Sequence, residues 1–330
     1  MRLRRSSKLQ RRIFMNKRLL AGILTAIMIL SLTGCTNKAL DAANQAVGTY
    51  NSEAKSYNEK VEAYNSKLVD VENANASLTE ATNKAQEVIN NGDEPYDEQT
   101  LTSLKNAMAT AGDAKVSVPE KLETVEEMSV NEEAKKDELE ALATKANEEA
   151  DKLKAFTFPE DPEVPDFSNE INGVEAALND YENSIKSMKQ ITAPSDDFVM
   201  ERLQRIDTIT MMAPVTEDHD PNGKLGKQGG YIGCIYFRDS QVDQSTLYVD
   251  GDREDVVDVG TQGGGAIEIF NTNEEAEARN TYLASFDGTI FVSGSHYVRG
   301  TVLIRTSDEL TGTQQLELTD KIKEALTAID

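Results

Sequence analysis

The chain has 330 residues, of which 38% are hydrophobic, so it is long enough for about two or three domains with at least one apolar core. Aromatic residues make up only 6% and tryptophan is absent, which suits slender helical structure better than an enzyme with deep apolar pockets. Residues 1–34 carry eight Lys and Arg and no acid, whereas the remainder carries 26 bases against 58 acids, a net charge of −32 that excludes nucleic-acid binding through repulsion by phosphate.

The N-terminus has the composition of an export signal. Basic residues up to Arg18 precede 14 uncharged residues, 19–32. This run is short for a membrane-spanning helix, which needs about 20 apolar residues, and matches the apolar region of a signal peptide. It ends in the sequence LTGC, residues 32–35, which resembles the lipobox of bacterial lipoproteins.

The lipobox resemblance implies a role for each of these four residues. Leu32, Thr33 and Gly34 are the expected recognition positions of the signal peptidase, and Cys35 is expected to receive diacylglycerol and become the mature N-terminus. An anchor with several acyl chains, such as palmitate, holds a protein on a membrane more firmly than one acyl chain does. We therefore expect an extracytoplasmic protein anchored to the cell membrane. The alternative is an ordinary signal peptide or short membrane helix that happens to end in a cysteine.

Two export routes fit the first residues. Arg11 and Arg12, followed by apolar residues, resemble a twin-arginine export signal. Met15, however, opens a complete lipoprotein signal of ordinary proportions, MNKRLLAGILTAIMILSLTGC. We favour a start at Met15, in which case the paired arginines are not translated and the chain is exported unfolded by general secretion.

Cysteine usage is simple once Cys35 is acylated. Cys234 is then the only other cysteine, so no intramolecular disulfide can form. Its surroundings, YIGCIYF, predict a buried strand in which the thiol serves as a small apolar side chain. A catalytic thiol is disfavoured because no histidine or basic residue lies nearby in the sequence.

Residues 40–89 show apolar spacings of three and four that predict a coiled coil. The a positions are Leu40, Val47, Ala54, Val61, Leu68, Asn75, Thr82 and Ile89, and the d positions are Ala43, Tyr50, Tyr57, Tyr64, Val71, Leu78 and Ala85. These residues would form a rod about 75 Å long. We expect the three tyrosines to pack in the seam instead of binding a ligand, and Asn75 to fix the register.

Turn residues at 90–95, NNGDEP, end this pattern. We expect further helices from about residue 96 to 111 and from Pro119 to about Lys154. The inner face of the second would consist of Leu122, Val125, Leu139, Leu142, Ala146, Ala150 and Leu153. The combined length of these helices nearly equals that of the first, so an intramolecular hairpin or three-helix bundle and a homodimeric coiled coil both fit.

The chain then divides into a spacer, one more stalk helix and a C-terminal domain. Residues 156–167 contain three of the eight prolines and are expected to be an extended, semi-rigid linker after the helical region 35–155. A helix over 168–193 repeats the heptad spacing, and Pro194 ends this helical stalk. Ser195 and the two acids after it are expected to cap a short helix that opens the domain 194–330.

The C-terminal segment predicts a mixed α+β domain, because period-two apolar runs alternate with Gly-rich turns. We place strands at 209–215, 230–237, 266–270 and 290–293, continuing through 296–305, and helices at 273–286 and 313–329. The segments GGYIGCIYF, GTQGGGAIEIF and GTVLIRTSDELT resemble a C-terminal module in surface lipoproteins of Gram-positive bacteria. The resemblance covers about 40% of the chain and implies the compartment, but no active site.

The sharpest candidate site is a calcium loop. Asp218, Asp220 and Asn222 supply oxygen donors at positions one, three and five, and Gly223 stands at six. Position twelve is Gly229 instead of Glu, so a calcium ion would need a further carboxylate from Asp250, Asp252, Glu254 or Asp255. We favour the alternative, an Asx turn between two strands.

Other candidates are weaker. The glycine run 260–265 suggests a phosphate cradle, but a strand follows it where a helix is required, so we expect a flexible turn. The two histidines, His219 and His296, lack zinc-type spacing, and we expect His296 on the surface of a β-hairpin. No nucleophile elbow, zinc-protease helix or paired-cysteine metal motif occurs in the sequence, and we assign no catalytic residue.

The leading functional hypothesis is a non-enzymatic lipoprotein whose coiled-coil stalk presents the C-terminal domain to a protein or cell-wall ligand, with diacylglycerol on Cys35 and no other cofactor. The first alternative is an extracellular hydrolase or wall-modifying enzyme whose site lies in the C-terminal domain. The second is a calcium-dependent binding module that uses Asp218, Asp220 and Asn222.

Overall fold

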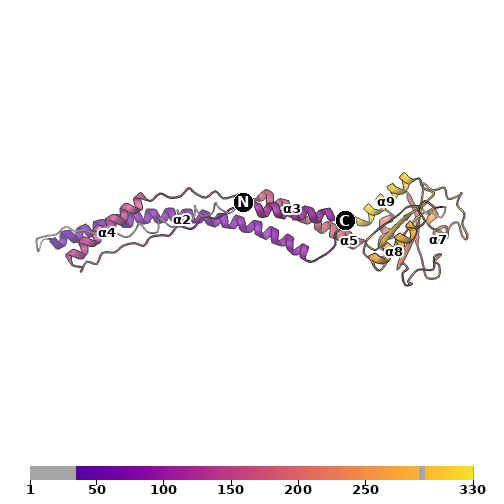
Figure 1. Ribbon diagram of the computed structural model, residues 1–330, viewed down its shortest axis with the longest axis horizontal. Coiled ribbons are helices and arrows are strands. Elements are labelled where there is room, and N and C mark those ends of the chain that lie inside the picture. Colours follow the sequence, from indigo (N-terminus) through magenta and orange to yellow (C-terminus); the bar gives the residue numbers. More distant parts are fainter. Residues whose placement is uncertain (1–34, 290–293, 330) are drawn as a thin grey trace, which may run out of the picture. The chain divides into compact units, whose positions relative to one another are not determined.

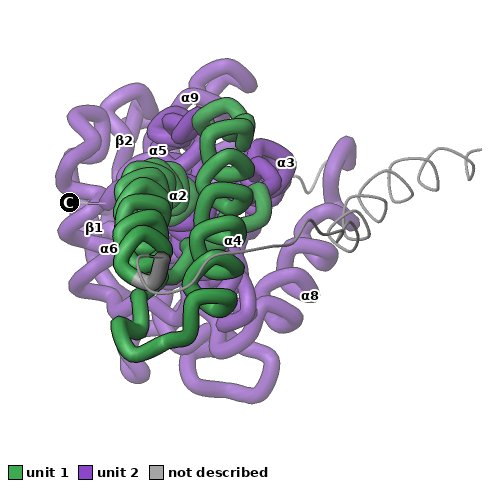
Figure 2. Tube along the Cα trace, turned by 90° about the vertical axis from the view of Figure 1, so that its left-hand side faces the viewer, with its two compact units in different colours: residues 1–69, 119–162 green, residues 70–118, 163–330 purple. Residues whose placement is uncertain are grey.

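The computed structural model describes residues 35–289 and 294–329 (Figure 1). The chain divides into two compact units, one of residues up to 69 with 119–162, the other of residues 70–118 and from 163 onward (Figure 2). The predicted signal segment with Leu32, Thr33 and Gly34, and the predicted strand at 290–293, lie outside the described residues. Among the described helices, none has the length and apolarity needed to span a membrane.

The helix α2, Cys35–Asn90, confirms the heptad prediction. Most of its buried side chains occupy the predicted a and d positions, among them Ala43, Val47, Ala54, Val61, Leu68, Val71, Leu78 and Ala85. Other segments of the same chain cover this seam in each unit. The intramolecular arrangement therefore buries the heptad residues, and dimerisation through the coiled coil stays a prediction.

In the first unit, α2 packs against α4, Lys136–Ala155. Alanines on both helices meet, with Ala146 and Ala150 of α4 packed among Ala46, Val47, Tyr50 and Ala54 of α2. Alanine side chains allow two helix backbones to approach closely. Beyond α4, Phe156 and Phe158 pack their rings on Tyr57, with centroids 5.2 Å apart in both pairs.

The predicted helix from Pro119 to Lys154 is wrong in its first half. Helix α4 begins only at Lys136, and residues 115–135 form neither helix nor strand. Leu122 and Val125 are half-buried as an extended chain, because asparagine side chains of α2 bind the backbone of this segment. A spacing of three suits one face of a helix and also an extended chain with three residues per turn.

In the second unit, the last part of α2 forms a three-helix bundle with α3, Glu98–Ala114, and α5, Ser168–Gln190. The side chains at its centre include Leu78, Leu104, Phe167, Val174, Leu178 and Tyr181. Asp97 caps α3 by accepting a hydrogen bond from the backbone N–H of Gln99 at 2.9 Å. Asn75, predicted to fix helix register, instead exchanges two hydrogen bonds with the backbone of Val116, at 2.8 and 3.2 Å.

The predicted α+β domain is present and belongs to the second unit. Its sheet is antiparallel throughout, in the order β1-β2-β3-β5-β4. The strands are β1 Ile209–Pro214, β2 Gly233–Asp239, β3 Gly264–Ile269, β4 His296–Arg299 and β5 Val302–Thr306. The helices are α6 Asp196–Leu203, α7 Val256–Val259, α8 Asn273–Ala284 and α9 Gly312–Thr327, with the 3-10 turn η2 at Gly260–Gly263.

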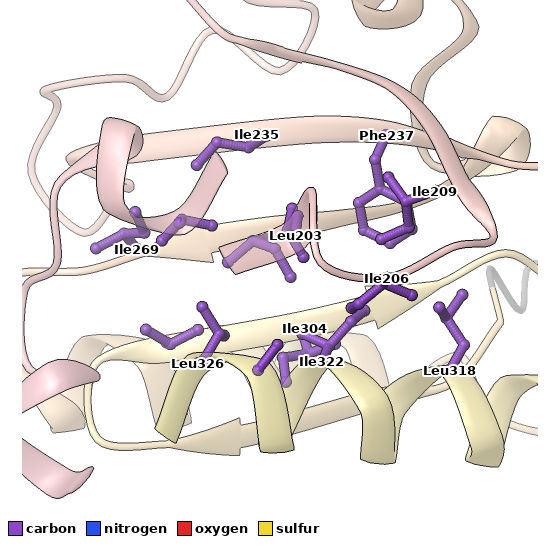
Figure 3. Packing of buried hydrophobic residues seen from close by; sticks show 14 of the residues in the cluster. Leu203, Ile206, Ile209, Ile235, Phe237, Ile269, Ile304, Leu318, Ile322 and Leu326 are labelled. Atoms are coloured by element: carbon purple, nitrogen blue, oxygen red, sulfur yellow. The ribbon is translucent and has the colours of Figure 1, made fainter. Parts of the chain in front are cut away.

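The two faces of the sheet are covered by different helices. Side chains that alternate along β2, β3 and β5 meet α6 and α9, where Leu203, Leu318 and Ile322 are almost completely buried (Figure 3). The opposite face lies under α7 and α8, with Ala276 and Leu283 from α8. Full burial of one such aliphatic side chain stabilises the fold by about 1.5–3 kcal/mol.

The domain and the three-helix bundle share α5. Met188 and Ile191 at the end of this helix enter the core of the domain, and the carbonyl of Ile191 accepts the N–H of Thr301 at 3.0 Å. The turn between α2 and α3 also contacts β4: Arg299 donates through Nη2 to the carbonyl oxygens of Pro95 and Tyr96 at 2.9 and 3.0 Å. The bundle and the domain are therefore joined through packed side chains and hydrogen bonds.

Candidate functional site

The Asx turn predicted after β1 is present, with Asp220 at its centre. One carboxylate oxygen accepts the N–H of Asn222 at 3.0 Å and the hydroxyl of Tyr231, and the other accepts the N–H groups of Lys224 and Leu225. Burial raises the pKa of Asp220, but these four hydrogen bonds outweigh burial and leave the pKa below its usual value. The carboxylate is therefore ionised and organises the loop.

The structure gives the three predicted calcium ligands separate surroundings. Asp218 is exposed, whereas Asn222 donates its side-chain N–H to the hydroxyl of Tyr236 at 2.8 Å. Both oxygens of Asp220 already accept two hydrogen bonds each, so a calcium ion would have to replace donors of the turn. The calcium site stays a prediction.

His219, in the same loop, lies between two carboxylates from the segment before and within α7. Its Nε2 is 2.7 Å from Oδ1 of Asp258, and its Nδ1 is 3.7 Å from Oδ2 of Asp255. In the part of the chain that the structure describes, this is the group of His, Cys, Asp or Glu side chains with the spacing of metal ligands. The sequence predicts Asp255 only as a helper of the calcium loop and does not predict the pairing of His219 with Asp258, because only the folded loops bring these residues together.

Backbone N–H groups orient both carboxylates. Oδ2 of Asp258 accepts the N–H of Asp252 at 2.8 Å. Oδ1 of Asp255 accepts the N–H of Val257 at 2.8 Å and so caps α7. Each acid thus keeps its second oxygen for His219, an arrangement resembling the outer hydrogen bonds that fix ligand orientation in metal sites.

His219 and Asp258 shift each other's pKa. The hydrogen bond to Asp258 raises the pKa of His219, although burial opposes this effect. The N–H of Asp252, followed by His219, lowers the pKa of Asp258. The side chains of His219 and Asp258 are 42% and 24% exposed, so solvent ions have access to them.

The distances assign different roles to the two acids. At 2.7 Å, Asp258 is a hydrogen-bond partner that orients the imidazole ring. Two ligands with bonds of about 2.0–2.2 Å lie roughly 3.3–3.6 Å apart around a tetrahedral ion, which is close to the separation between Nδ1 of His219 and Asp255. An imidazole nitrogen with a carboxylate oxygen suits zinc or a similar transition metal better than calcium.

A buried ion cluster on the face of the sheet beneath α8 escaped sequence reasoning. Glu268 is fully buried and accepts hydrogen bonds from Nε of Arg279 at 2.8 Å and Nη1 of Arg305 at 3.0 Å. The only hint in the sequence is that β3 and β5 each carry a charged residue, Glu268 and Arg305, among the alternating side chains of a strand. Their pairing depends on the register of the sheet and on α8, neither of which is local in sequence.

The remaining predicted candidates have structural roles. Cys234 is buried in β2 as predicted, and burial raises the pKa of its thiol, which disfavours the reactive thiolate. His296 starts β4, but its side chain is only 14% exposed because it contacts Asn280 and Asp287. The glycine run is more than a flexible turn: Gly265 lies in β3, where a Cβ atom would be 2.3 Å from the ring of Phe237.

Comparisons with known proteins add no assignment. No protein family, curated protein or solved structure matches this chain. The resemblance to lipoproteins therefore depends on the sequence motifs alone.

Proposed function

We propose that this chain is an extracytoplasmic lipoprotein, anchored by diacylglycerol on Cys35, whose helical stalk carries the C-terminal α+β domain as a binding module for a protein ligand. The sequence LTGC at residues 32–35 supports the anchor. Helix α2 runs from Cys35, so the stalk would begin at the lipidated residue without an intervening linker. The hydrolase alternative and a cell-wall polymer as ligand stay predictions.

The observation that carries this proposal is the firm attachment of the domain to the three-helix bundle. Arg299 of β4 holds two carbonyl oxygens of the α2–α3 turn and lies 3.3 Å from the carboxylate of Glu94. Ser187 of α5 donates to the carbonyl oxygen of Thr327 in α9 at 2.8 Å. A binding module held this way keeps its orientation on the bundle, which lowers the entropy lost on binding.

The loop between β2 and α7 has the chemistry of a binding surface. Tyr248 is 85% exposed, and the acids nearest to it in sequence are exposed as well, namely Asp243, Asp250, Asp252 and Glu254. Contacts within the domain hold this loop in place, because Leu247 is buried and Arg253 donates to the carbonyl oxygens of Gln244 and Leu247 at 2.7 and 2.9 Å. An exposed tyrosine among carboxylates fits a cationic protein segment.

Metabolic labelling tests the anchor. Cells that express the full chain are fed an alkyne-bearing fatty acid, and the wild type is compared with Cys35→Ala and with the matched control Cys234→Ala. We expect label in the wild type and the control but not in Cys35→Ala, which should leave the membrane fraction. Equal labelling of Cys35→Ala would contradict the anchor.

Affinity capture tests the binding module. Residues 35–330 serve as bait on immobilised supports, with Tyr248→Ala and a double variant, Asp250→Asn with Asp252→Asn, as comparisons. We expect a basic protein that binds the wild type at low salt, binds the variants at least tenfold more weakly and dissociates as salt rises. Capture that is identical for all three baits would overturn the assignment of this loop.

A second candidate function is binding of a transition-metal ion, which the placement of His219 and Asp255 favours. Thermal unfolding of the full chain is compared in zinc, calcium and chelator, with His219→Gln and Asp218→Asn as variants. We expect zinc to raise the midpoint of the wild type and of Asp218→Asn but not of His219→Gln, because an ion bound only to the folded state stabilises it. A rise in calcium that Asp218→Asn abolishes would instead support the calcium loop.

A further inference from the structure

In the first unit, α2 holds an extended segment, residues 119–130, that we call the strap. Asn51, Asn58 and Asn65 each form two hydrogen bonds with one residue of the strap. The side-chain NH₂ donates to the carbonyl oxygen of that residue, and the side-chain oxygen accepts its backbone N–H, as in the pairing of two β-strands. Their partners are Met128, Val125 and Leu122, respectively, and all six distances are 2.8 or 2.9 Å. The strap therefore runs antiparallel to α2.

The repeat length of the helix matches that of the strap. Seven residues of a helix rise about 10.5 Å, and three residues of an extended chain span roughly 9–10 Å. An asparagine at every heptad therefore meets every third residue of the strap. The sequence carries this signal as the dipeptide Tyr-Asn at residues 50–51, 57–58 and 64–65.

The strap is held on the surface. None of residues 119–130 is buried, and its apolar residues Leu122, Val125 and Met128 are only half-buried. Between them lie exposed residues such as Glu123 and Thr124. Side chains of α2 form hydrogen bonds with the backbone of the strap, and these include one from the hydroxyl of Tyr50 to the carbonyl oxygen of Glu126 at 2.8 Å.

We propose that the Tyr-Asn heptads of α2 are a recognition surface for an extended polypeptide, and that the strap of a second copy of this chain can replace the chain's own. The hydrogen bonds of the three asparagines go to backbone atoms of the strap, so these bonds select an extended main chain instead of particular side chains. A second copy offers the same main chain with an apolar residue at every third position. Exchange of identical segments between copies yields a dimer without new contacts.

This surface does not include Cys35, the proposed lipidation site, although both belong to the first unit. Tyr248, His219 and Arg299 of the α+β domain lie in the second unit. The role of this surface therefore does not depend on the proposed function. If the tests of the lipid anchor or of the binding loop fail, this role is unaffected, and the converse also holds.

Binding in trans tests the proposal. The probe is a fluorescent synthetic peptide of residues 117–132, and the receptor is the chain 35–330 with Leu122, Val125 and Met128 changed to Ser, which weakens its own strap and leaves the asparagines intact. We expect saturable binding, at least tenfold tighter than to the unaltered chain, whose own strap competes at millimolar effective concentration. Changing Asn51, Asn58 and Asn65 to Ala should abolish binding. Binding that survives these changes, binding of a scrambled peptide with equal affinity, or no binding at 1 mM peptide would overturn the proposal.

Hydrogen exchange on the unaltered chain provides a second measurement that does not depend on the serine variant. Leucine, valine, methionine, glutamate and threonine are labelled with ¹⁵N. We expect amides of Leu122, Val125 and Met128 to exchange at least tenfold more slowly than those of Glu123 and Thr124, since only the former donate to asparagines. Asn58→Ala should remove the protection of Val125, whereas Asn58→Asp should retain it because a carboxylate still accepts. Uniform exchange along the strap would contradict main-chain recognition.

Discussion

The same heptad helix has different partners in the two compact units. In the first unit, α2 is paired with an extended strap through amide hydrogen bonds, and the apolar side chains of the strap are only half-buried. In the second unit, α2 belongs to a three-helix bundle that joins a sheet whose central side chains, such as Ile235 and Phe237, are completely buried. A heptad pattern therefore specifies a buried stripe on the helix without specifying which segment covers it.

The largest effect is expected where charge is buried in the second unit. Changing Glu268 to Ala leaves Arg279 and Arg305 without this carboxylate partner, and such a change typically costs about 3–5 kcal/mol. Urea unfolding followed by the fluorescence of tyrosines in the domain would measure the loss. The exposed Glu254→Ala is the control, and equal losses for the two variants would show that burial of Glu268 contributes nothing.

A smaller loss is expected at the connection between bundle and domain. Arg299→Ala removes two hydrogen bonds from a charged donor, but the side chain is partly exposed to solvent, so we expect a total loss of only about 1–3 kcal/mol. We expect hydrogen exchange to accelerate in the α2–α3 turn and in β4 but not in α4. Arg253→Ala, which alters a loop of the same domain, should leave that turn unchanged.

The strap should respond locally. Asn58→Ala removes one pair of hydrogen bonds, each worth about 0.5–1.5 kcal/mol, so the strap should open more often while the second unit keeps its stability. Limited proteolysis should then cut between residues 119 and 130 faster than in the wild type. Asn73→Ala, on the same helix outside the Tyr-Asn repeat, provides the control. A loss of stability in the second unit would mean that the two units do not unfold independently.

The smallest effect is expected at His219, whose side chain is substantially exposed. Its pKa is raised above 6.5, so its contribution to stability is complete below pH 6.5 and disappears as pH rises through the raised value. The pKa of Asp258 is lowered below 3.8, so its contribution is present above pH 3.8 and disappears as pH falls through the lowered value. The stability difference between wild type and His219→Gln should thus be greatest between about pH 4 and 6.5.

NMR titration of the imidazole checks this prediction directly. Asp258→Asn should lower the pKa of His219, because it removes the charged hydrogen-bond acceptor. Asp243→Asn, a change at an exposed acid that binds Ser245, is the control. A His219 pKa at or below 6.5 in the wild type would remove the physical basis for the pair.

Local periodicity explains which sequence predictions succeeded. The a and d residues of α2 are buried, and the runs around Cys234 and Ile267 form strands of the sheet, because side-chain direction repeats with backbone geometry. The helix expected after Pro119 failed because a spacing of three fits two backbone conformations. The asparagines of α2, distant in sequence, favour the extended one.

By itself, the sequence determined the heptad stripe, the change from helical to β periodicity near residue 207, the burial of Cys234 and the motif that predicts lipidation at Cys35. All of these depend on residues adjacent in the chain or spaced by one helical or strand period. Only the tertiary structure decided that residues 119–130 are extended, that Glu268 meets two arginines, and that His219 lies between Asp255 and Asp258. These contacts join segments far apart in sequence, so they depend on sheet register, loop path and the packing of whole elements, which no local pattern encodes.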